Sequence, residues 1–329
     1  MPSSEMLLGV VLVVGLVLYF LLGGADFGGG VWDLLARGPR QAAQRAAVER
    51  AIGPIWEANH VWLILVIVVL FTGFPRAFAV LATRLYVPLT IFLLGIVLRG
   101  SAFSFRGLDH AGAAHRRWGR VFSITSVIAP FSLGAMVAAI ASGRLPTGDS
   151  VAWASPFAFS CGALALALCA FLAATYLTVE VTDPAVREDF RRRALGAGLA
   201  AGVAAGVALL LAQAGAPLIY AGLSARPFTW PFHAATAAAA LGALLALWRR
   251  RFPVARALAA AQVALVILGW AASQYPYLVP PVVTLSNAAA PARTRTLLLM
   301  ILGGGVPILL PSLVVLYRVF KRPRQPGAV

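Results

Sequence analysis

The sequence predicts an all-α polytopic membrane protein with nine transmembrane helices. Hydrophobic residues occupy 60% of the 329 positions and charged residues only 12%, and the mean hydropathy is +0.86. This composition excludes an ordinary soluble domain. Nine segments reach or approach the ~20 largely apolar residues that a spanning helix needs. The connections between them are alternately rich and poor in arginine, as expected of a chain that crosses a bilayer repeatedly.

The apolar segments follow one another without a long polar linker or room for a soluble domain. We therefore expect residues 1–329 to form a single integral membrane domain. The two longest connections, 99–120 and 274–295, have about twenty residues each. The expected helices cover residues 6–22 (with 35 as the far limit), 56–74, 84–98, 121–142, 156–179, 194–214, 230–248, 254–273 and 296–320.

Particular residues decide how three segments are interpreted. The stretch before the first apolar run contains Glu5 but no lysine or arginine, which indicates a retained helix and not a cleaved secretory signal. Residues 75–83 either extend the third helix or form a short interfacial turn. In the last long connection, Pro276, Pro280 and Pro281 exclude a continuous helix.

Basic residues set the expected orientation. The net charge of +16 would suit a nucleic-acid-binding protein, but the arginines recur between apolar segments, so no nucleic acid partner is expected. Every second connection is basic, and one side of the bilayer carries 21 of the 27 lysines and arginines. Because basic connections stay in the cytoplasm, we expect the N-terminus outside and the C-terminus in the cytoplasm. Residues 37–50, in the first basic connection, are expected to form an interfacial helix.

The two cysteines, Cys161 and Cys169, lie in one apolar segment. On a helix their spacing corresponds to a rise of about 12 Å, which is too long for a disulfide. The chain has neither a CxxC nor a CxxCH motif, so a redox thiol pair and a covalently attached haem are not indicated. Both cysteines are expected to be packing residues.

The first candidate site lies at the cytoplasmic start of the second helix, in Gly53-Pro54-Ile55-Trp56-Glu57-Ala58-Asn59-His60-Val61-Trp62. Glu57 and His60 are three residues apart and share one helical face. A charged group at bilayer depth costs at least ~2.5 kcal/mol, and a carboxylate in a low-dielectric setting can carry a proton to a buried site. We interpret Glu57, Asn59 and His60 as part of a proton pathway. The alternative is an interfacial Glu57 paired with an arginine such as Arg50.

The second candidate is Asp26, which lies among five glycines in residues 23–30 at the inner end of the first helix. Glycines permit close helix approach or a local break that admits water, and either would serve a proton route. The alternative is a helix end with Asp26 solvated at the cytoplasmic face. We expect Asp26 and Glu57 to face each other. Asp33 is expected to be interfacial and paired with Arg37, four residues further on.

His60 and His233 are the two histidines in apolar segments, and they are candidates for a haem-ligating pair. The expected orientation puts them near opposite faces, most of a ~30 Å core apart, so one haem cannot be bridged by both. We therefore expect no haem or metal bound directly by this chain. A single histidine with another axial ligand is the alternative.

Three arginines flank the third helix. Topology and contact with lipid phosphate account for Arg99 and Arg106, whereas Arg84 lies on the outer side, against the charge rule, and is expected to have a defined partner. All three are candidates for contact with a partner subunit or with lipid.

Three segments carry a specific pattern, namely Gly23-Gly24-Ala25-Asp26-Phe27-Gly28-Gly29-Gly30, the run from Gly53 to Leu63, and Arg99-Gly100-Ser101-Ala102-Phe103-Ser104-Phe105-Arg106. Together they resemble subunit II of the cytochrome bd-type quinol oxidases. The segments 275–281 and 287–291 resemble the last outer loop of divergent members of that family. The similarity is densest in the first third of the chain, and residues 120–256 carry little of it.

The resemblance implies two four-helix bundles, over about 6–142 and 156–273, plus a peripheral ninth helix over about 296–320. It also implies a heterodimer with subunit I, which holds two b-type haems, haem d or a third b-type haem, and the quinol site. This chain would then be a haem-free partner, not catalytic alone, that stabilises an oxidase transferring electrons from quinol to dioxygen in a prokaryotic cytoplasmic membrane. The family also allows a structural quinone in this subunit and small accessory membrane subunits.

The resemblance places acids of a cytoplasmic proton route at the positions of Asp26 and Glu57. Many members have Asp at the position of Glu57 and Gln at that of His60, so the acid chemistry is kept with a different reach. An independent proton-coupled transporter is the alternative, and it would carry discontinuous helices in matching halves. A haem-bearing cytochrome is a second alternative, which the depths of the histidines disfavour.

Overall fold

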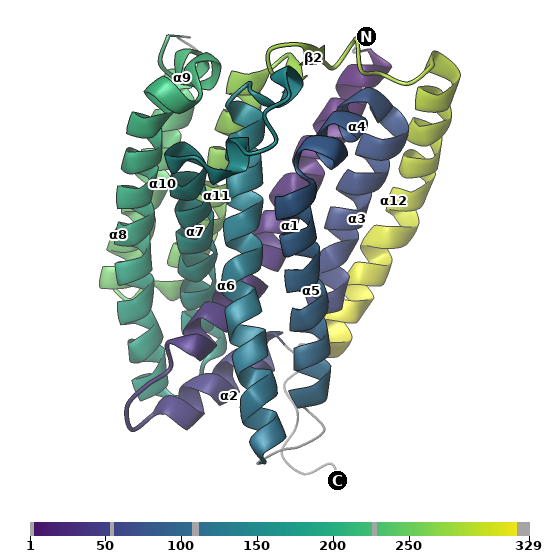
Figure 1. The fold of residues 1–329 in the computed structure, drawn as a ribbon. Helices are drawn as coiled ribbons and strands as arrows, with labels where there is room; N and C mark the ends of the chain where they lie inside the picture. Colours follow the sequence, from purple (N-terminus) through teal and green to yellow (C-terminus); the bar gives the residue numbers. More distant parts are fainter. Residues whose placement is uncertain (1–2, 53–55, 107–111, 226–228, 321–329) are drawn as a thin grey trace.

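The computed structural model describes residues 3–52, 56–106, 112–225 and 229–320. Its long helices run side by side (Figure 1). The helices are α1 (Ser4–Leu34), α2 (Gln41–Ile52), α3 (Trp56–Gly73), α4 (Pro75–Arg84), α5 (Tyr86–Arg106), α6 (Ala113–Ala141), α7 (Pro156–Glu180), α8 (Pro184–Gly215), α9 (Pro217–Ser224), α10 (Trp230–Trp248), α11 (Phe252–Gln274) and α12 (Ala292–Phe320). Two short 3-10 turns, η1 (Leu145–Thr147) and η2 (Ala152–Ala154), and an antiparallel pair of strands, β1 (Tyr277–Val279) and β2 (Val283–Thr284), complete the described elements.

The helices confirm the predicted class, an all-α polytopic membrane protein. Among the described residues, eight helices are long and apolar enough to cross a membrane, and a ninth span results if α2 and α3 are counted together. The eight are α1, α5, α6, α7, α8, α10, α11 and α12. Several helices exceed their apolar segments, because arginine-rich turns continue the helix beyond the apolar part, as at the starts of α6 and α8.

Helix boundaries decide between the alternatives that the sequence allowed. α1 is one continuous helix through residues 23–30, so its glycines serve close packing and not a helix break. Residues 75–84 form a separate helix, α4, with Pro75 in its first turn. The first basic connection contains α2, and the connection after α11 forms the β1–β2 pair without a continuous helix, as predicted.

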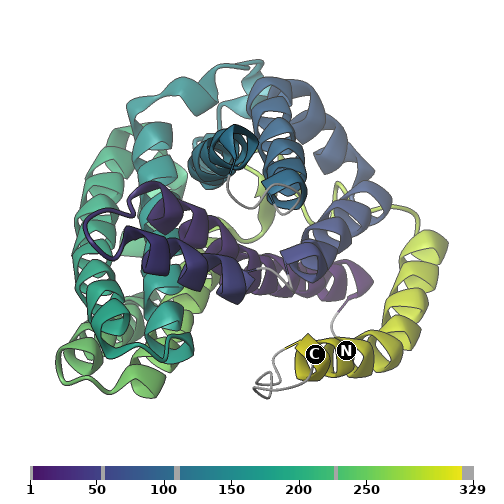
Figure 2. The same cartoon turned by 90° about the horizontal axis from the view of Figure 1, so that it is seen from below.

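α6 and α7 form the centre of the molecule and α12 forms its edge. In the most apolar 18-residue stretch of each helix, 61% of the residues of α6 and of α7 are buried, against 6% in α12. α7 packs against α1, α6, α8 and α11, whereas α12 packs mainly against α1 and α3. Viewed along the helices, α12 stands at the periphery (Figure 2).

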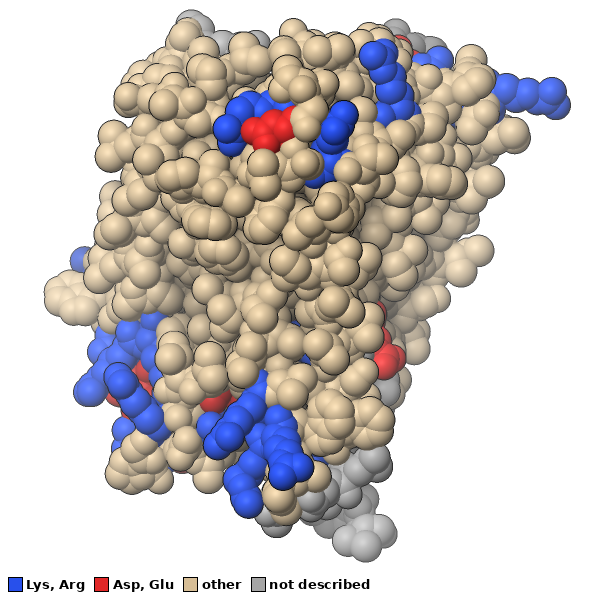
Figure 3. All heavy atoms as spheres, viewed as in Figure 1, with Lys and Arg blue, Asp and Glu red and all other residues tan. Residues whose placement is uncertain are grey.

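The two ends of the helix assembly differ in their elements and charge. One end, called the basic end below, carries α2 and the α7–α8 and α10–α11 connections, and the other carries α4, α9 and β2 (Figure 1). Charged side chains gather near both ends of the visible face, with the larger arginine clusters at the basic end (Figure 3). The mainly uncharged band between them is what a bilayer core requires.

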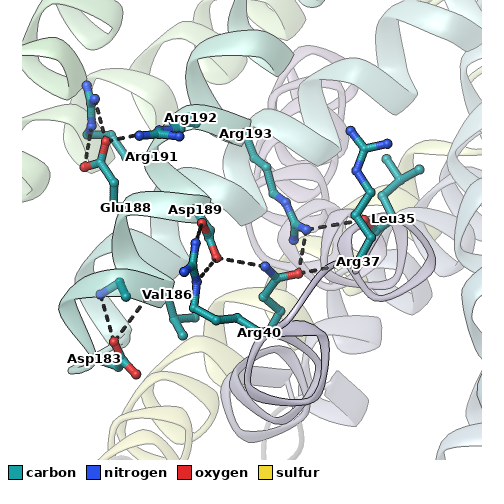
Figure 4. Close-up of polar contacts among 12 residues, drawn as sticks. Leu35, Arg37, Arg40, Asp183, Val186, Glu188, Asp189, Arg191, Arg192 and Arg193 are labelled. Atoms are coloured by element: carbon teal, nitrogen blue, oxygen red, sulfur yellow. Dashed lines mark hydrogen bonds and ion pairs between the residues drawn. The ribbon is translucent and has the colours of Figure 1, made fainter.

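At the basic end, α8 is tied to the segment that contains α2 (Figure 4). Arg40 donates from Nε and Nη2 to the two carboxylate oxygens of Asp189, at 2.8 and 2.6 Å. Gln44 donates to the same carboxylate at 2.8 Å and accepts from Arg193 at 2.7 Å. Because the Arg40 contact is bidentate and joined to two further hydrogen bonds, it holds α2 across the bundle end.

At the opposite end, two contacts attach α12 to the rest of the chain. Arg295 Nη1 lies 2.7 Å from Glu5 Oε2, which joins the first turns of α12 and α1. The backbone N–H of Ala290 donates to the carbonyl of Gly73, at the end of α3, at 2.8 Å. These polar contacts fix the start of α12, and Leu302, Leu309 and Leu313 pack against the core further along the helix.

Close approach of α1 and α7 depends on Gly28. A β-carbon on Gly28 would overlap the carbonyl oxygen of Cys169, which is backbone and cannot move aside. Gly30 has a similar position against the hydroxyl of Ser126 on α6. Small residues at helix contacts let backbones approach in membranes, where apolar packing alone gives little drive to associate.

We expect Gly28→Ala to reduce the yield of folded protein and to lower its apparent Tm in detergent, because the added methyl forces α1 and α7 apart. Overpacking of this kind typically costs about 1–3 kcal/mol. The matched control is Gly202→Ala in α8, where an added β-carbon meets nothing within 4 Å and alanine favours the helix. Equal Tm values for the two variants would contradict the close-packing role of Gly28.

Candidate functional site

Asp26 and Asn59 form the centre of the candidate site. Asp26 lies on α1, is half-buried, and accepts a hydrogen bond of 2.5 Å from Asn59 Nδ2 on α3. Asn59 itself is only 4% exposed. The predicted proximity of the polar start of α3 to Asp26 is therefore present, and the contact is made by the amide.

Glu57 does not share this position. It lies in the first turn of α3 and is exposed. Residues two apart on an α-helix point about 200° apart, so Asn59 and Glu57 cannot both face α1. The expectation that Asp26 and Glu57 face each other thus differs from the structure, and the reason is the helical geometry of α3.

Arg99 of α5 lies buried beside Asp26. It is 2% exposed, and its Nε donates to Ser126 Oγ of α6 at 3.0 Å. The guanidinium carbon lies 5.1 and 5.0 Å from the ring centroids of Phe27 and Phe122, and its charge interacts favourably with that of Asp26. Arg99 therefore faces the protein interior. We had expected it to contact lipid or a partner subunit.

Tyr19 and His60 complete the cluster. Tyr19 of α1 is 1% exposed, and its ring centroid lies 6.0 Å from that of the half-buried His60. Tyr19 was not singled out from the sequence, although it precedes Asp26 by two helical turns and so lies on the same face of α1. Tyr19, Asp26, Asn59, His60 and Arg99 are called the interior polar cluster below.

Two deeply buried atoms of this cluster have no protein hydrogen-bond partner among the described residues. They are the Tyr19 hydroxyl and Arg99 Nη2. Buried polar groups are almost always hydrogen-bonded, and in a polar interior the partner is commonly an ordered water. The cluster is thus suited to hold water beside Asp26.

A cavity of about 110 Å³ reaches Asp26 and Asn59 from the basic end. It is bounded by residues of α1, α2, α3, α7 and α11. Ligand pockets typically measure ~300–1,000 Å³, whereas one water occupies about 30 Å³ of liquid, so this cavity fits a few waters and not a quinone.

A second buried charge pair lies two helical turns after Asp26, at the basic end. Asp33 is 3% exposed and accepts from Arg106 Nη1 at 3.3 Å and from the Ser123 hydroxyl at 2.7 Å. Arg45 and Glu49 of α2 approach this pair at 4.0 and 3.7 Å. The expected interfacial Asp33 paired with Arg37 is therefore wrong, because α1 continues to Leu34 and turns Asp33 towards α5 and α6.

Arg106 and Arg84 have partners within the chain. Arg106 is 5% exposed and paired with Asp33, so it does not occupy the lipid or interface position expected for it. Arg84 is half-buried and donates from Nη1 to the carbonyl of Gly148 at 3.3 Å, so it has a defined partner within the chain.

The two candidate haem ligands lie at opposite ends of the molecule. His60 is in the first turns of α3, near the basic end, whereas His233 is in the first turn of α10 at the other end. His233 Nε2 lies 3.0 Å from the carbonyl of Leu223. These two residues therefore cannot bind one haem between them. Within the described residues, no group of three or more His, Cys, Asp or Glu side chains is placed to hold a metal ion.

The fold and the cluster define a class of protein, a polytopic membrane protein with a buried polar cluster and a cavity large enough for a few waters near one bundle end. The family model for cytochrome bd terminal oxidase subunit II matches residues 4–320. The chain therefore belongs to the cytochrome bd terminal oxidase subunit II family, whose members are subunits of an oxidoreductase complex.

Individual relatives agree with this family. Cytochrome bd ubiquinol oxidase subunit 2 of Bacillus subtilis is 36% identical over 137 residues, which span 41% of this chain and 40% of that protein. A second Bacillus subtilis protein, provisionally named a cytochrome bd menaquinol oxidase subunit II, is 24% identical over 98% of this chain and 97% of its own length. The bd oxidase structure from Geobacillus thermodenitrificans contains a chain with the same fold, at a TM-score of 0.77 and 23% identity, covering 97% of this chain and 99% of that one.

We expect Asp33→Ala to destabilise the protein by about 3–5 kcal/mol, because Arg106 would keep a buried charge without its main partner. Thermal unfolding in detergent measures this as a lowered apparent Tm. The control is Asp149→Ala, which removes an ion pair with Arg144 whose side chains are 26% and 48% exposed, and exposed pairs contribute only about 0–1 kcal/mol. A loss at Asp33 no larger than at Asp149 would show that the buried pair is not structurally required.

Proposed function

We propose that this chain is the haem-free subunit II of a complex that oxidises quinol and reduces dioxygen to water, and that it contributes a proton-uptake route from the cytoplasm. The observation that carries the proposal is the interior polar cluster, in which Asp26 meets a cavity that reaches it from the basic end. Dioxygen reduction consumes protons, and an acid at this position can take a proton from cavity water and release it further inward.

Each residue of the cluster has a distinct task in this route. Asp26 receives and releases the proton. Asn59 donates to the carboxylate of Asp26 and so fixes its orientation. The positive charge of the buried Arg99 attracts the same carboxylate. His60, beside Tyr19, is proposed to line the continuation of the route. Glu57, exposed at the start of α3, is proposed to collect protons from the cytoplasmic water.

We further propose that the chain crosses the membrane nine times, as one membrane domain over residues 1–329. α3 has 18 residues and a length of about 27 Å, close to the ~30 Å core, which supports its role as the ninth span. The proposed arrangement is one four-helix bundle of α1, α3, α5 and α6, another of α7, α8, α10 and α11, and α12 as the peripheral helix. The basic end would face the cytoplasm.

The proposed partner is subunit I, which would carry two b-type haems, haem d or a third b-type haem, and the quinol site. The haems supply the electron-transfer and oxygen chemistry, and this chain supplies stabilisation and protons. Arg84, partly exposed at the opposite end, is proposed to contact subunit I or lipid. A structural quinone, if bound, would lie outside the cavity at Asp26, and small accessory subunits are further proposed partners.

An independent proton-coupled transporter is the competing function, and it receives less support. Transporters of that kind bind substrate at discontinuous helices near the bilayer midplane. Here the glycine-rich part of α1 is continuous helix, packed against α6 and α7. The family match over residues 4–320 also favours the oxidase subunit.

We expect Asp26→Asn and Glu57→Gln each to slow quinol-driven oxygen consumption by about tenfold or more, because an amide cannot hold and release a proton. Loss of an acid–base group commonly costs ~100-fold or more. Haem content should be unchanged, since neither side chain is placed to bind haem. Oxygen consumption by the purified complex, with its visible spectrum, measures both quantities.

Glu57→Asp is the matched control, and it should retain appreciable activity because it keeps a carboxylate at a shorter reach. A Glu57→Gln complex with full haem and the parental rate would make Glu57 an interfacial anchor. Loss of haem would instead assign it a structural role.

The orientation has its own test. A reporter fused after Val329 should be cytoplasmic, whereas a reporter inserted near Thr147, between α6 and α7, should lie outside, as the distribution of arginines requires. Activity of both reporters on the same side of the membrane would refute nine spans.

A further inference from the structure

We propose that protons reach Asp26 through an entrance between α2, α7 and α11, and that Glu180, paired with Arg256, is the acid at its mouth. This inference rests on the proposed proton-uptake function and adds to it the entrance through which protons from the basic end, including those collected at Glu57, pass inward to Asp26. In the proton step, the carboxylic acid of Glu180 gives a proton to cavity water, the water passes a proton to the carboxylate of Asp26, and Glu180 is reprotonated from bulk water.

The cavity beside Asp26 has an inner and an outer end. Asp26 and Asn59 lie in the wall at the inner end. Glu180, the last residue of α7, and Arg256, in the first turns of α11, lie in the wall at the outer end, at the basic end of the molecule. Most of the remaining wall is apolar, apart from Tyr176. With room for roughly three or four waters at about 30 Å³ each, the cavity is able to join the two acids by a short water chain.

A second hollow, of about 510 Å³, adjoins the first from the surface. The two hollows share Ala51 and Glu180 in their walls. The outer hollow is lined by Ala43, Ala47 and Arg50 of α2 and by residues 181–183 after α7. Ala51 and Glu180 thus mark the neck between surface water and the interior.

The charge pair at the neck is accessible to water. Arg256 Nη1 lies 3.3 Å from Glu180 Oε1, and the two side chains are 38% and 36% exposed. The guanidinium carbon of Arg256 lies 4.9 Å from the ring centroid of Tyr176, which keeps it over the α7 side of the neck. Exposed pairs of this kind contribute little to stability. The exposure of Glu180 leaves its carboxylate in reach of bulk water, as an acid that must be reprotonated requires.

Glu180 differs in this respect from the other acid of the α7–α8 region. Glu188 pairs with Arg191, Arg192 and Arg250, and it lines neither of the two hollows. The contacts of Glu188 are those expected of an acid with a purely structural role. The position of Glu180 in both walls is what assigns it to the route.

The first test measures access and transport through the neck in the intact purified complex. In a Cys161→Ala, Cys169→Ala background, Ala51→Cys is treated with a small water-soluble methanethiosulfonate. We expect labelling, and an oxygen-consumption rate at least tenfold lower after labelling, because the adduct fills the neck. Ala42→Cys, exposed on α2 but outside both hollows, should be labelled without loss of rate. An unlabelled Ala51→Cys, or a fully labelled one at the parental rate, would overturn the proposal.

The second test addresses the acid itself. We expect Glu180→Gln to slow oxygen consumption about tenfold, Glu180→Asp to restore most of the rate, and Glu188→Gln to keep the parental rate. Glu180→Gln at the parental rate, with Asp26→Asn slow, would refute this entrance and leave the proposed function intact. If Asp26→Asn is also at the parental rate, the proton-uptake function itself fails. Should Glu180→Gln not assemble, the labelling of Ala51→Cys still decides.

Discussion

A buried guanidinium is the constraint on which the interior of this protein depends. Arg99 lies within the helix assembly, where an unpaired charge would be very unfavourable, and so its surroundings must compensate it. They do so with the charge of Asp26, the hydroxyl of Ser126 and two aromatic rings. Because these groups come from α1 and α6 and Arg99 belongs to α5, the interactions that satisfy Arg99 hold three helices together.

The close approach of the helices follows from small residues in α1. Gly28 and Gly30 bring the backbone of α1 against α7 and α6, and no larger residue fits at either position without displacement. One face of α1 then carries the interior cluster, and its last turn carries Asp33, bonded to Arg106 and Ser123. The cavity that the proposed proton route uses lies beside Asp26 and Asn59, where α1 and α3 meet α2, α7 and α11.

Much of the fold was predictable, because apolar length and the alternation of arginines are local properties of the sequence. The polar part of the site was predictable to the level of Asp26 and the start of α3. Residue type and depth can be inferred from the sequence, but the rotation of each helix about its axis cannot. For this reason Glu57 was expected to face Asp26, whereas in the structure Asn59 does. Rotation also explains Arg99 and Arg106, whose side chains turn inward, and Tyr19, whose role appears only once α1 and α3 are packed.

The proposed route is tested most directly by proton uptake during dioxygen reduction, followed in the intact complex with a water-soluble pH indicator. If Asp26 passes protons inward, a fully assembled Asp26→Asn complex takes them up at least about tenfold more slowly than the parent, while its haem spectrum and initial electron transfer are unchanged. Proton uptake at the parental rate in that complex would contradict the account, and would reduce the interior polar cluster to a structural device that keeps Arg99 compensated.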